Sequence, residues 1–109
     1  MKLIKSIVRP NKLDDVCEAL ERLNVSGVTV TDVRGHGRQK GHTTVYRGRE
    51  YSVNLLPKVQ LEVVVSDHLV DEIIRAIIET ARTGEIGDGR VFVLPVDYGY
   101  NIRTGERDA

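Results

Sequence analysis

The sequence predicts an α+β domain in which two amphipathic helices cover one face of a four-stranded antiparallel sheet. Three observations support this prediction. Apolar residues alternate with polar ones over four short segments, they recur at helical spacing over two longer ones, and the order strand, helix, strand occurs twice. The chain has 109 residues, which fits a single domain over residues 1–109 and leaves little room for a second.

The first half of this repeat opens with a short strand. We expect it over residues 2–9, which are rich in Leu, Ile and Val, with Pro10 ending the ladder. A helix is expected over residues 12–23, with Asn11 as its N-cap. The apolar stripe of this helix contains Leu13, Val16, Cys17, Leu20 and Leu23, so Cys17 is interpreted as a small packing residue.

The second half repeats the same order. Strands are expected over residues 28–33, 59–65 and 91–96. A helix lies between the last two, and the glycine-rich loop 83–90 follows it. The apolar stripe of that helix is Val70, Ile73, Ile74, Ile77, Ile78 and Ala81. The order βαββαβ is that of a ferredoxin-like sandwich. Apolar residues lie on both faces of the first and the last strand. We therefore expect another copy of the chain to cover the free face of the sheet, in a homo-oligomer.

A long polar segment separates the second and third strands. From about Gly37 to Leu55 the chain is rich in glycine and charge and shows no periodicity. A structureless stretch of this length in a compact domain is usually functional or disordered. Tyr46 and Tyr51 lie within it, either exposed to a modifying enzyme or a partner, or folded back onto the domain.

The loop 83–90 is a candidate phosphate site. Its three glycines permit positive φ and a close approach of backbone N–H groups to an anion, and Arg90 can bind a phosphate through two N–H groups. An ordinary helix-to-strand turn has a similar composition, so both interpretations stay open. The other basic residues that either converge on this loop or remain solvated are Arg38, Lys40, Lys58 and Arg103.

The composition argues against several other classes. Sixteen basic and sixteen acidic residues balance, which does not favour a nucleic-acid protein. Cys17 is the single cysteine, and no set of Cys and His residues has the spacing of a zinc site. We find neither a signal peptide nor a window approaching the roughly 20 apolar residues that cross a bilayer. We therefore expect a cytoplasmic location.

Three motifs resemble those of the PII nitrogen-regulatory signal transduction proteins. The matching segments are Gly35–Thr43 with Tyr46–Tyr51 and Leu56–Lys58, then Thr83–Val93, then Arg103–Glu106. They resemble the T-loop (residues 37–55), the B-loop (83–90) and the C-loop with the tail (101–109) of that family. The resemblance covers essentially all 109 residues. It implies a ferredoxin-like homotrimer that acts as a regulator and not as an enzyme.

The resemblance also implies ligands. ATP and ADP would compete for sites in the clefts between subunits, and 2-oxoglutarate would bind together with Mg-ATP. The residues that match nucleotide-binding positions are Thr29, Gly37, Arg38, Gln39, Glu62, Val63, Val64, Gly87, Asp88, Gly89, Arg90 and Arg103. Those that match 2-oxoglutarate positions are Gln39, Lys40, Gly41, Lys58 and Gly87. Gln39 also matches the position that coordinates Mg²⁺.

The resemblance assigns the output to the T-loop. Tyr51 matches the tyrosine that is uridylylated or adenylylated in some bacteria, and Arg47 matches the arginine that plugs ammonium-transporter pores. The expected partner is an ammonium transporter or a nitrogen-assimilation enzyme, with membrane contact only through a transporter and no nucleic acid.

Two positions depart from the family pattern. Asn101 stands where a second phosphate-binding arginine is usual, and Arg49 stands where a small residue is usual. Beside a ligand-gated regulator, two further hypotheses therefore stay open: a slow ATPase, and an interaction module with weakened nucleotide binding.

Overall fold

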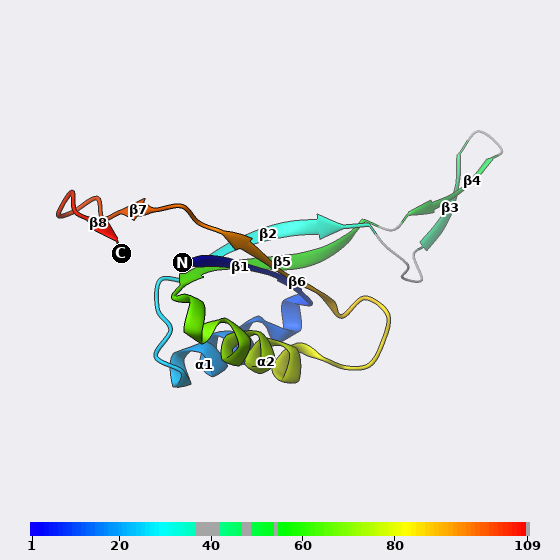
Figure 1. Ribbon diagram of the computed structural model, residues 1–109. Coiled ribbons are helices and arrows are strands. Elements are labelled where there is room, and N and C mark those ends of the chain that lie inside the picture. Colours follow the sequence, from blue (N-terminus) through cyan, green and yellow to red (C-terminus); the bar gives the residue numbers. More distant parts are fainter. Residues whose placement is uncertain (37–41, 47–48, 54, 109) are drawn as a thin grey trace.

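The computed structural model describes residues 1–36, 42–46, 49–53 and 55–108, with residues 42–46 and 49–53 described by their backbone alone. The main sheet has four strands in the order β2-β5-β1-β6, and each neighbouring pair is antiparallel. These strands are β1 (Lys2–Val8), β2 (Thr29–Gly35), β5 (Leu56–Val65) and β6 (Gly89–Pro95). Helices α1 (Leu13–Arg22) and α2 (Val70–Ala81) lie side by side on one face of the sheet (Figure 1). The predicted ferredoxin-like fold is confirmed.

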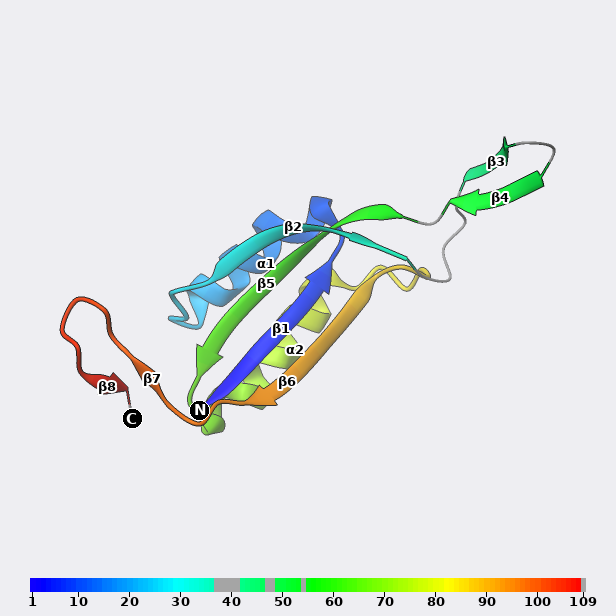
Figure 2. The same ribbon diagram turned by 90° about the horizontal axis from the view of Figure 1, so that it is seen from above.

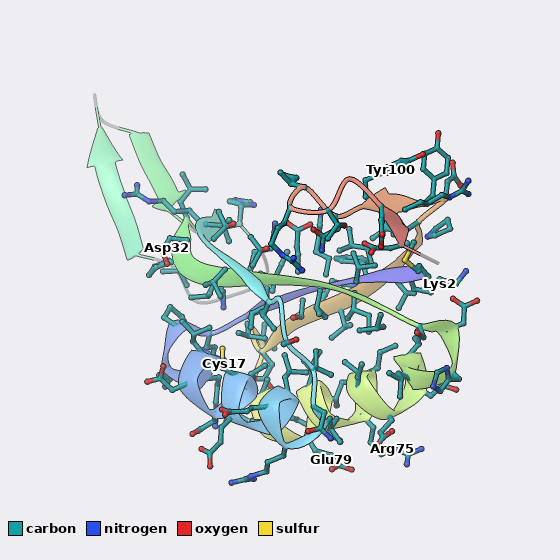
Figure 3. All side chains as sticks on the ribbon, turned by 90° about the vertical axis from the view of Figure 1, so that its left-hand side faces the viewer. Lys2, Cys17, Asp32, Arg75, Glu79 and Tyr100 are labelled. Carbon is teal, nitrogen blue, oxygen red and sulfur yellow. The ribbon has the colours of Figure 1, made fainter. Side chains whose placement is uncertain are left out.

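The core lies between the helices and the sheet and follows the two periodicities of the sequence. In the central strand β1, the alternate residues Ile4, Ser6 and Val8 are buried. Alternate residues of β5 and one stripe of each helix complete the core. The buried apolar residues are Ile4, Val8, Val16, Leu20, Val59, Leu61, Val63, Val65, Ile73, Ile77 and Ala81. Cys17 is a residue of α1 and packs against this cluster (Figure 3). Burial raises the pKa of its thiol.

Both helices begin one turn later than an ordinary side-chain cap would place them. A 3₁₀ turn, η1 (Pro10–Lys12), precedes α1, and a second, η2 (Asp67–Leu69), precedes α2. The prediction of Asn11 as the N-cap is wrong, because Asn11 lies inside η1 and the residue before α1 is Lys12, which makes no capping side-chain bond. The fixed φ of Pro10 starts the tighter turn, and its carbonyl accepts the backbone N–H of Leu13.

The polar segment between β2 and β5 contains a β-hairpin. Strands β3 (His42–Tyr46) and β4 (Arg49–Val53) pair antiparallel and lie away from the main sheet (Figures 1 and 2). The expectation that residues 37–55 have no secondary structure is therefore wrong for these strands, whereas residues 37–41, 47–48 and 54 lie outside the described part. The Thr, Val and Tyr residues of both strands have high β-propensity, and pairing satisfies their backbone groups locally.

The C-terminal tail also contains a short hairpin, formed by β7 (Gly99–Tyr100) and β8 (Arg107–Asp108). The rings of Tyr98 and Tyr100 meet edge to face with their centroids 5.9 Å apart, and the Arg107 guanidinium lies 4.6 Å from the centre of the Tyr98 ring. The sequence predicted no strands in the tail, because strands of two residues have no detectable periodicity. β6 likewise begins at Gly89, two residues earlier than the predicted strand.

Apolar side chains remain exposed on the sheet face that the helices leave open. Because Ile4 is buried beneath the helices, its neighbour Leu3 points to the opposite face, and the register places Val64 and Leu94 on either side of it. The exposed fractions are 49% for Val64, 46% for Phe92 and 39% for Leu94. Figure 3 shows Arg75 and Glu79 projecting into solvent below α2, and Tyr100 on the far side of the sheet. An apolar patch of this kind is typical of a surface that a partner covers.

Gly89 offers a sharp test of the β1–β6 register. Its φ is +115°, and a Cβ built on it would lie 1.7 Å from the Ile7 carbonyl oxygen. Gly84 is a matched control, because its φ is +90° but a Cβ there meets no atom within 4 Å. We expect Gly84→Ala to lower the free energy of unfolding by about 1–3 kcal/mol through backbone strain, and Gly89→Ala to lower it by about 1–3 kcal/mol more through overpacking.

The measurement is urea unfolding of both variants and the parent at one protein concentration. Equal losses in the two variants would show that the close approach of β6 to Ile7 does not exist in solution.

Candidate anion-binding site

A cleft of about 660 Å³ opens at the end of the sheet where β2 ends and β6 begins. Figure 2 shows that these two strand ends lie at the same end of the sheet. The register brings its walls together, because Gly35 is opposite Leu56 and Val8 is opposite Gly89. The lining residues are Ile7, Gly35, His36, Lys58, Glu85, Ile86, Gly87, Asp88, Gly89 and Arg90. The segment after β2 and the loop before β6 therefore lie at one end of the sheet. A volume of this size is in the range of small-molecule sites.

The 83–89 loop is folded around the carboxylate of Asp88. One oxygen accepts the backbone N–H groups of Thr83 and Gly84, each at 2.8 Å, and the other accepts the Thr83 hydroxyl at 2.5 Å. The same hydroxyl oxygen accepts the backbone N–H of Glu85 at 3.1 Å. An acid side chain that accepts local backbone donors stabilises a turn in this way. The carboxylate of Asp88 therefore shapes the loop from within.

Two basic side chains attach this loop to the sheet. At the end of β1, Arg9 donates from Nε to Asp88 at 3.1 Å and from Nη2 to the Ile86 carbonyl at 3.0 Å. At the start of β5, Lys58 donates from Nζ to the Gly87 carbonyl at 2.5 Å. Lys58 is only 7% exposed, so its amine reaches the loop from beneath the cleft. The loop is thus held at three successive residues, 86 to 88.

The pKa values of Lys58 and Asp88 are both lowered, but for different reasons. Burial lowers the pKa of Lys58, the nearby Arg9 lowers it further, and Asp88 partly offsets both. The hydrogen bond from the Thr83 hydroxyl holds the pKa of Asp88 far below its usual range, and the two backbone N–H groups and Arg9 act in the same direction against desolvation. Asp88 is consequently ionised at neutral pH.

Other predicted nucleotide residues lie away from the cleft within one chain. Thr29 is opposite Glu62 in the β2–β5 pair, six residues before Gly35, or roughly 20 Å at about 3.3 Å per residue. The Val63 side chain belongs to the core, so only its backbone is available, while Val64 is exposed on the open face. These residues form a second group on the same sheet.

Arg103 belongs to neither group. It lies in the turn between β7 and β8, which follows the end of β6 where Pro95 is opposite Lys2. The cleft is at the other end of that strand, where Gly89 is opposite Val8. Of the two possibilities that the sequence leaves open for Arg103, convergence on the loop 83–90 does not occur within one chain.

Most predicted residues of the T-loop fall outside the described part of the chain. These are Gly37, Arg38, Gln39, Lys40, Gly41 and Arg47. Tyr51 and Arg49 belong to β4, but their side chains are likewise outside the description. His36 precedes the T-loop and Leu55 is its last residue, and these two residues join it to β2 and β5, the strands that border the cleft.

Sequence reasoning missed four residues of this site: Ile7, Arg9, Gly35 and His36. Ile7 and Arg9 belong to a segment interpreted only as a strand, and their place beside the loop depends on the β1–β6 register. Gly35 and His36 were noted as part of a glycine-rich segment without a role. The signal that could have identified them is their position at the end of a strand, because loops that connect strands gather at the ends of the sheet.

Comparison with known proteins decides the family. A family model described as Nitrogen regulatory protein P-II matches residues 1–106. The chain belongs to the P-II family. It is 60% identical over 108 residues to the nitrogen regulatory protein P-II of Haemophilus influenzae, covering 99% of this chain and 96% of that protein. It is 56% identical over 108 residues to nitrogen regulatory protein P-II 1 of Escherichia coli K12, with the same coverage. For the Rhizobium etli P-II protein, the identity is 51% over 109 residues, covering 100% and 97%.

Membership of the P-II family confirms the resemblance that the three motifs carry. In the part of this family member that the structure describes, no helix has the length and apolar character needed to cross a membrane. The same residues contain no cluster of three or more His, Cys, Asp or Glu side chains that could hold a metal.

The depressed pKa of Asp88 predicts how acid acts on the fold. Between the folded and the unfolded pKa of this carboxyl, the unfolded chain binds more protons, so stability rises with pH across that window. The contribution is complete above the unfolded value of about 3.9 and is lost as pH falls further. We expect Asp88→Asn to flatten the decrease in unfolding midpoint below about pH 4.

The measurement is the thermal midpoint of parent and variant between neutral pH and acid. Thr83→Val removes the hydroxyl that contributes most to the shift and is expected to flatten the same part of the curve by a smaller amount. A parent-like curve for Asp88→Asn would contradict the assignment.

Proposed function

We propose that this protein binds ATP and ADP competitively at the cleft and reports the bound nucleotide to target proteins through the T-loop, residues 37–55. One observation carries the proposal: the B-loop is folded in advance against Arg9 and Lys58, in the cleft that Gly35 and His36 border at the root of the T-loop. Folded backbone and positive charge suit phosphate. A nucleotide there would favour some T-loop conformations over others, which is a population shift.

The distribution of the matched residues supports a homotrimer with sites between subunits. One chain keeps the B-loop at one end of its sheet and Thr29 with Glu62 farther along it. A second copy that covers the open sheet face would bring the second group, and the turn carrying Arg103, toward the first. Ile102 in this turn is fully exposed, and Val64 and Phe92 are half exposed. Both facts favour coverage by another subunit.

The residues also fit 2-oxoglutarate bound with Mg-ATP. The Lys58 amine is positioned beneath the cleft, and a carboxylate is a better acceptor for an ammonium than the Gly87 carbonyl that it now contacts. Gln39, Lys40 and Gly41 would complete the acid site, with Gln39 contributing to Mg²⁺ coordination. When bound, Mg²⁺ neutralises phosphate charge.

We extend the proposal to the partners. The T-loop would contact an ammonium transporter through Arg47, or a nitrogen-assimilation enzyme, in the cytoplasm, and Tyr51 would be the site of covalent modification. Arg49 beside it changes the charge that a modifying enzyme would meet. The cleft does not favour hydrolysis of ATP, which needs a group that activates water. Asp88, the described carboxylate that contacts Arg9, already accepts four hydrogen bonds that hold the loop.

Calorimetry on nucleotide-stripped protein tests this function. We expect ATP and ADP to bind and to displace each other, and 2-oxoglutarate to bind only when Mg-ATP is present. Lys58→Met is expected to abolish the 2-oxoglutarate heat while ATP affinity falls less than tenfold, because Lys58 faces the acid and not the triphosphate. Absence of ATP and ADP binding at millimolar concentration would exclude the proposal.

The position of Asn101 allows a separate prediction about the affinity for ATP. Its side-chain oxygen accepts the Thr104 N–H at 3.1 Å, so it shapes the turn that carries Arg103 and adds no charge. We expect Asn101→Arg to strengthen ATP binding by about 1–3 kcal/mol, the size of a charge-assisted pair, and Asn101→Ala, which loses only the turn contact, not to strengthen it. Equal ATP affinities for Asn101→Arg and Asn101→Ala would count against a role for this turn in the nucleotide site.

A further inference from the structure

The hydrogen bonds of the B-loop fix the orientation of two consecutive peptide groups. The Ile86 carbonyl accepts from Arg9 Nη2, and the Gly87 carbonyl accepts from Lys58 Nζ. In a trans peptide the N–H points opposite to the C=O, and the described backbone contains no cis bond. The N–H groups of Gly87 and Asp88 are therefore turned away from the two basic side chains.

These two N–H groups are available to a ligand. Among the described residues, neither makes a close hydrogen bond to a carbonyl or a side chain, although residues 86 and 87 form a turn and both Gly87 and Asp88 line the cleft. The φ of Gly87 is +101°, a value that lets the two peptide groups turn in sequence. Successive N–H groups in such a turn form a concave site for an anion.

We propose that Arg9 is a positioning residue, which holds the Ile86 and Asp88 ends of this turn so that the N–H groups of Gly87 and Asp88 donate to an anion. Arg9 does not touch the anion in this proposal. It acts through the Asp88 carboxylate and the Ile86 carbonyl, which it contacts at the same time. The inference rests on the proposed function, because the anion is taken to be the phosphate chain of an adenine nucleotide.

The geometry of arginine suits this role better than that of lysine. Two nitrogens of one planar group, Nε and Nη2, donate to acceptors on residues 86 and 88, so the spacing of those acceptors is fixed. Arg9 is itself anchored, because it follows the last residue of β1 and its carbonyl accepts the Lys12 N–H at 3.0 Å. Its side chain is 26% exposed and that of Asp88 is 23% exposed, so the contact between them is partly shielded from water.

The test compares Arg9→Met and Arg9→Lys with Arg22→Met as the control. Arg22 also pairs with a carboxylate, that of Glu18, but lies exposed on α1 away from the cleft. The first measurement, without any nucleotide, is amide hydrogen exchange at Thr83 and Gly84, whose N–H groups donate to Asp88. We expect exchange to be at least about tenfold faster in Arg9→Met, intermediate in Arg9→Lys and unchanged in Arg22→Met.

The second measurement is the affinity of each variant for ATP, ADP and adenosine. We expect Arg9→Met to weaken ATP and ADP by roughly tenfold, about the effect of one lost charge-assisted contact, and to leave adenosine unchanged. An equal loss for adenosine, together with a lower unfolding midpoint, would mean a merely structural role and would overturn the proposal. Unchanged ATP affinity with faster exchange would overturn it as well.

Failure of the two proposals can be told apart. If the parent binds neither ATP nor ADP, the proposed function fails, and hydrogen exchange still decides whether Arg9 holds the loop. Exchange at Thr83 and Gly84 that is the same in Arg9→Met and the parent overturns the role of Arg9, whatever the nucleotide result.

Discussion

The site depends on one carboxylate. Asp88 accepts two backbone N–H groups, the Thr83 hydroxyl and the Arg9 guanidinium, and so connects the end of α2, the loop and the end of β1. A buried or half-buried carboxylate is stable only where its acceptors are satisfied, and here the donors come from the loop that it closes. The carboxylate accepts all four bonds, and they are strongest in its ionised form, so the shape of the loop depends on the charge of Asp88.

The sequence was sufficient for the parts of the fold that periodicity determines. Alternation over β5 and the stripes of α1 and α2 identified the core, and the element order identified the topology. The sequence was insufficient where the pairing of distant segments determines which residues lie side by side. Arg9 was predicted only as the last residue of an apolar strand. The β1–β6 register brings it to the loop at Ile86, which lies 77 residues away in the sequence. The β3–β4 hairpin was missed for a different reason, since two strands of five residues are too short for a clear period among glycines and charges.

The same register explains why one chain holds only part of the predicted nucleotide site. Antiparallel pairing sets the B-loop at one end of β6 and the C-terminal hairpin beyond the other, so a seven-residue strand keeps them apart. Thr29 and Glu62 are held away from the cleft by the β2–β5 ladder in the same manner. For Thr29 and Glu62, no loop motion within the chain changes this separation, because it follows from backbone hydrogen bonds in the sheet. On the proposed function, these residues and the B-loop that act on one ligand would come from different copies.

Lys58 and Gly35 line the cleft and also belong to the two strands that the T-loop connects. Gly35 ends β2 and Lys58 lies near the start of β5, so they belong to the two strands that enter and leave the loop. A Cβ at Gly35 would lie 3.2 Å from the Lys58 Cγ, so the glycine leaves room for the lysine stem to pass beneath the strand end. The Lys58 amine then reaches the Gly87 carbonyl. On the proposed function, a ligand that takes this amine from Gly87 must move a side chain packed against the root of the T-loop. On that function, the coupling between ligand and loop would follow from packing and would require no long pathway through the domain.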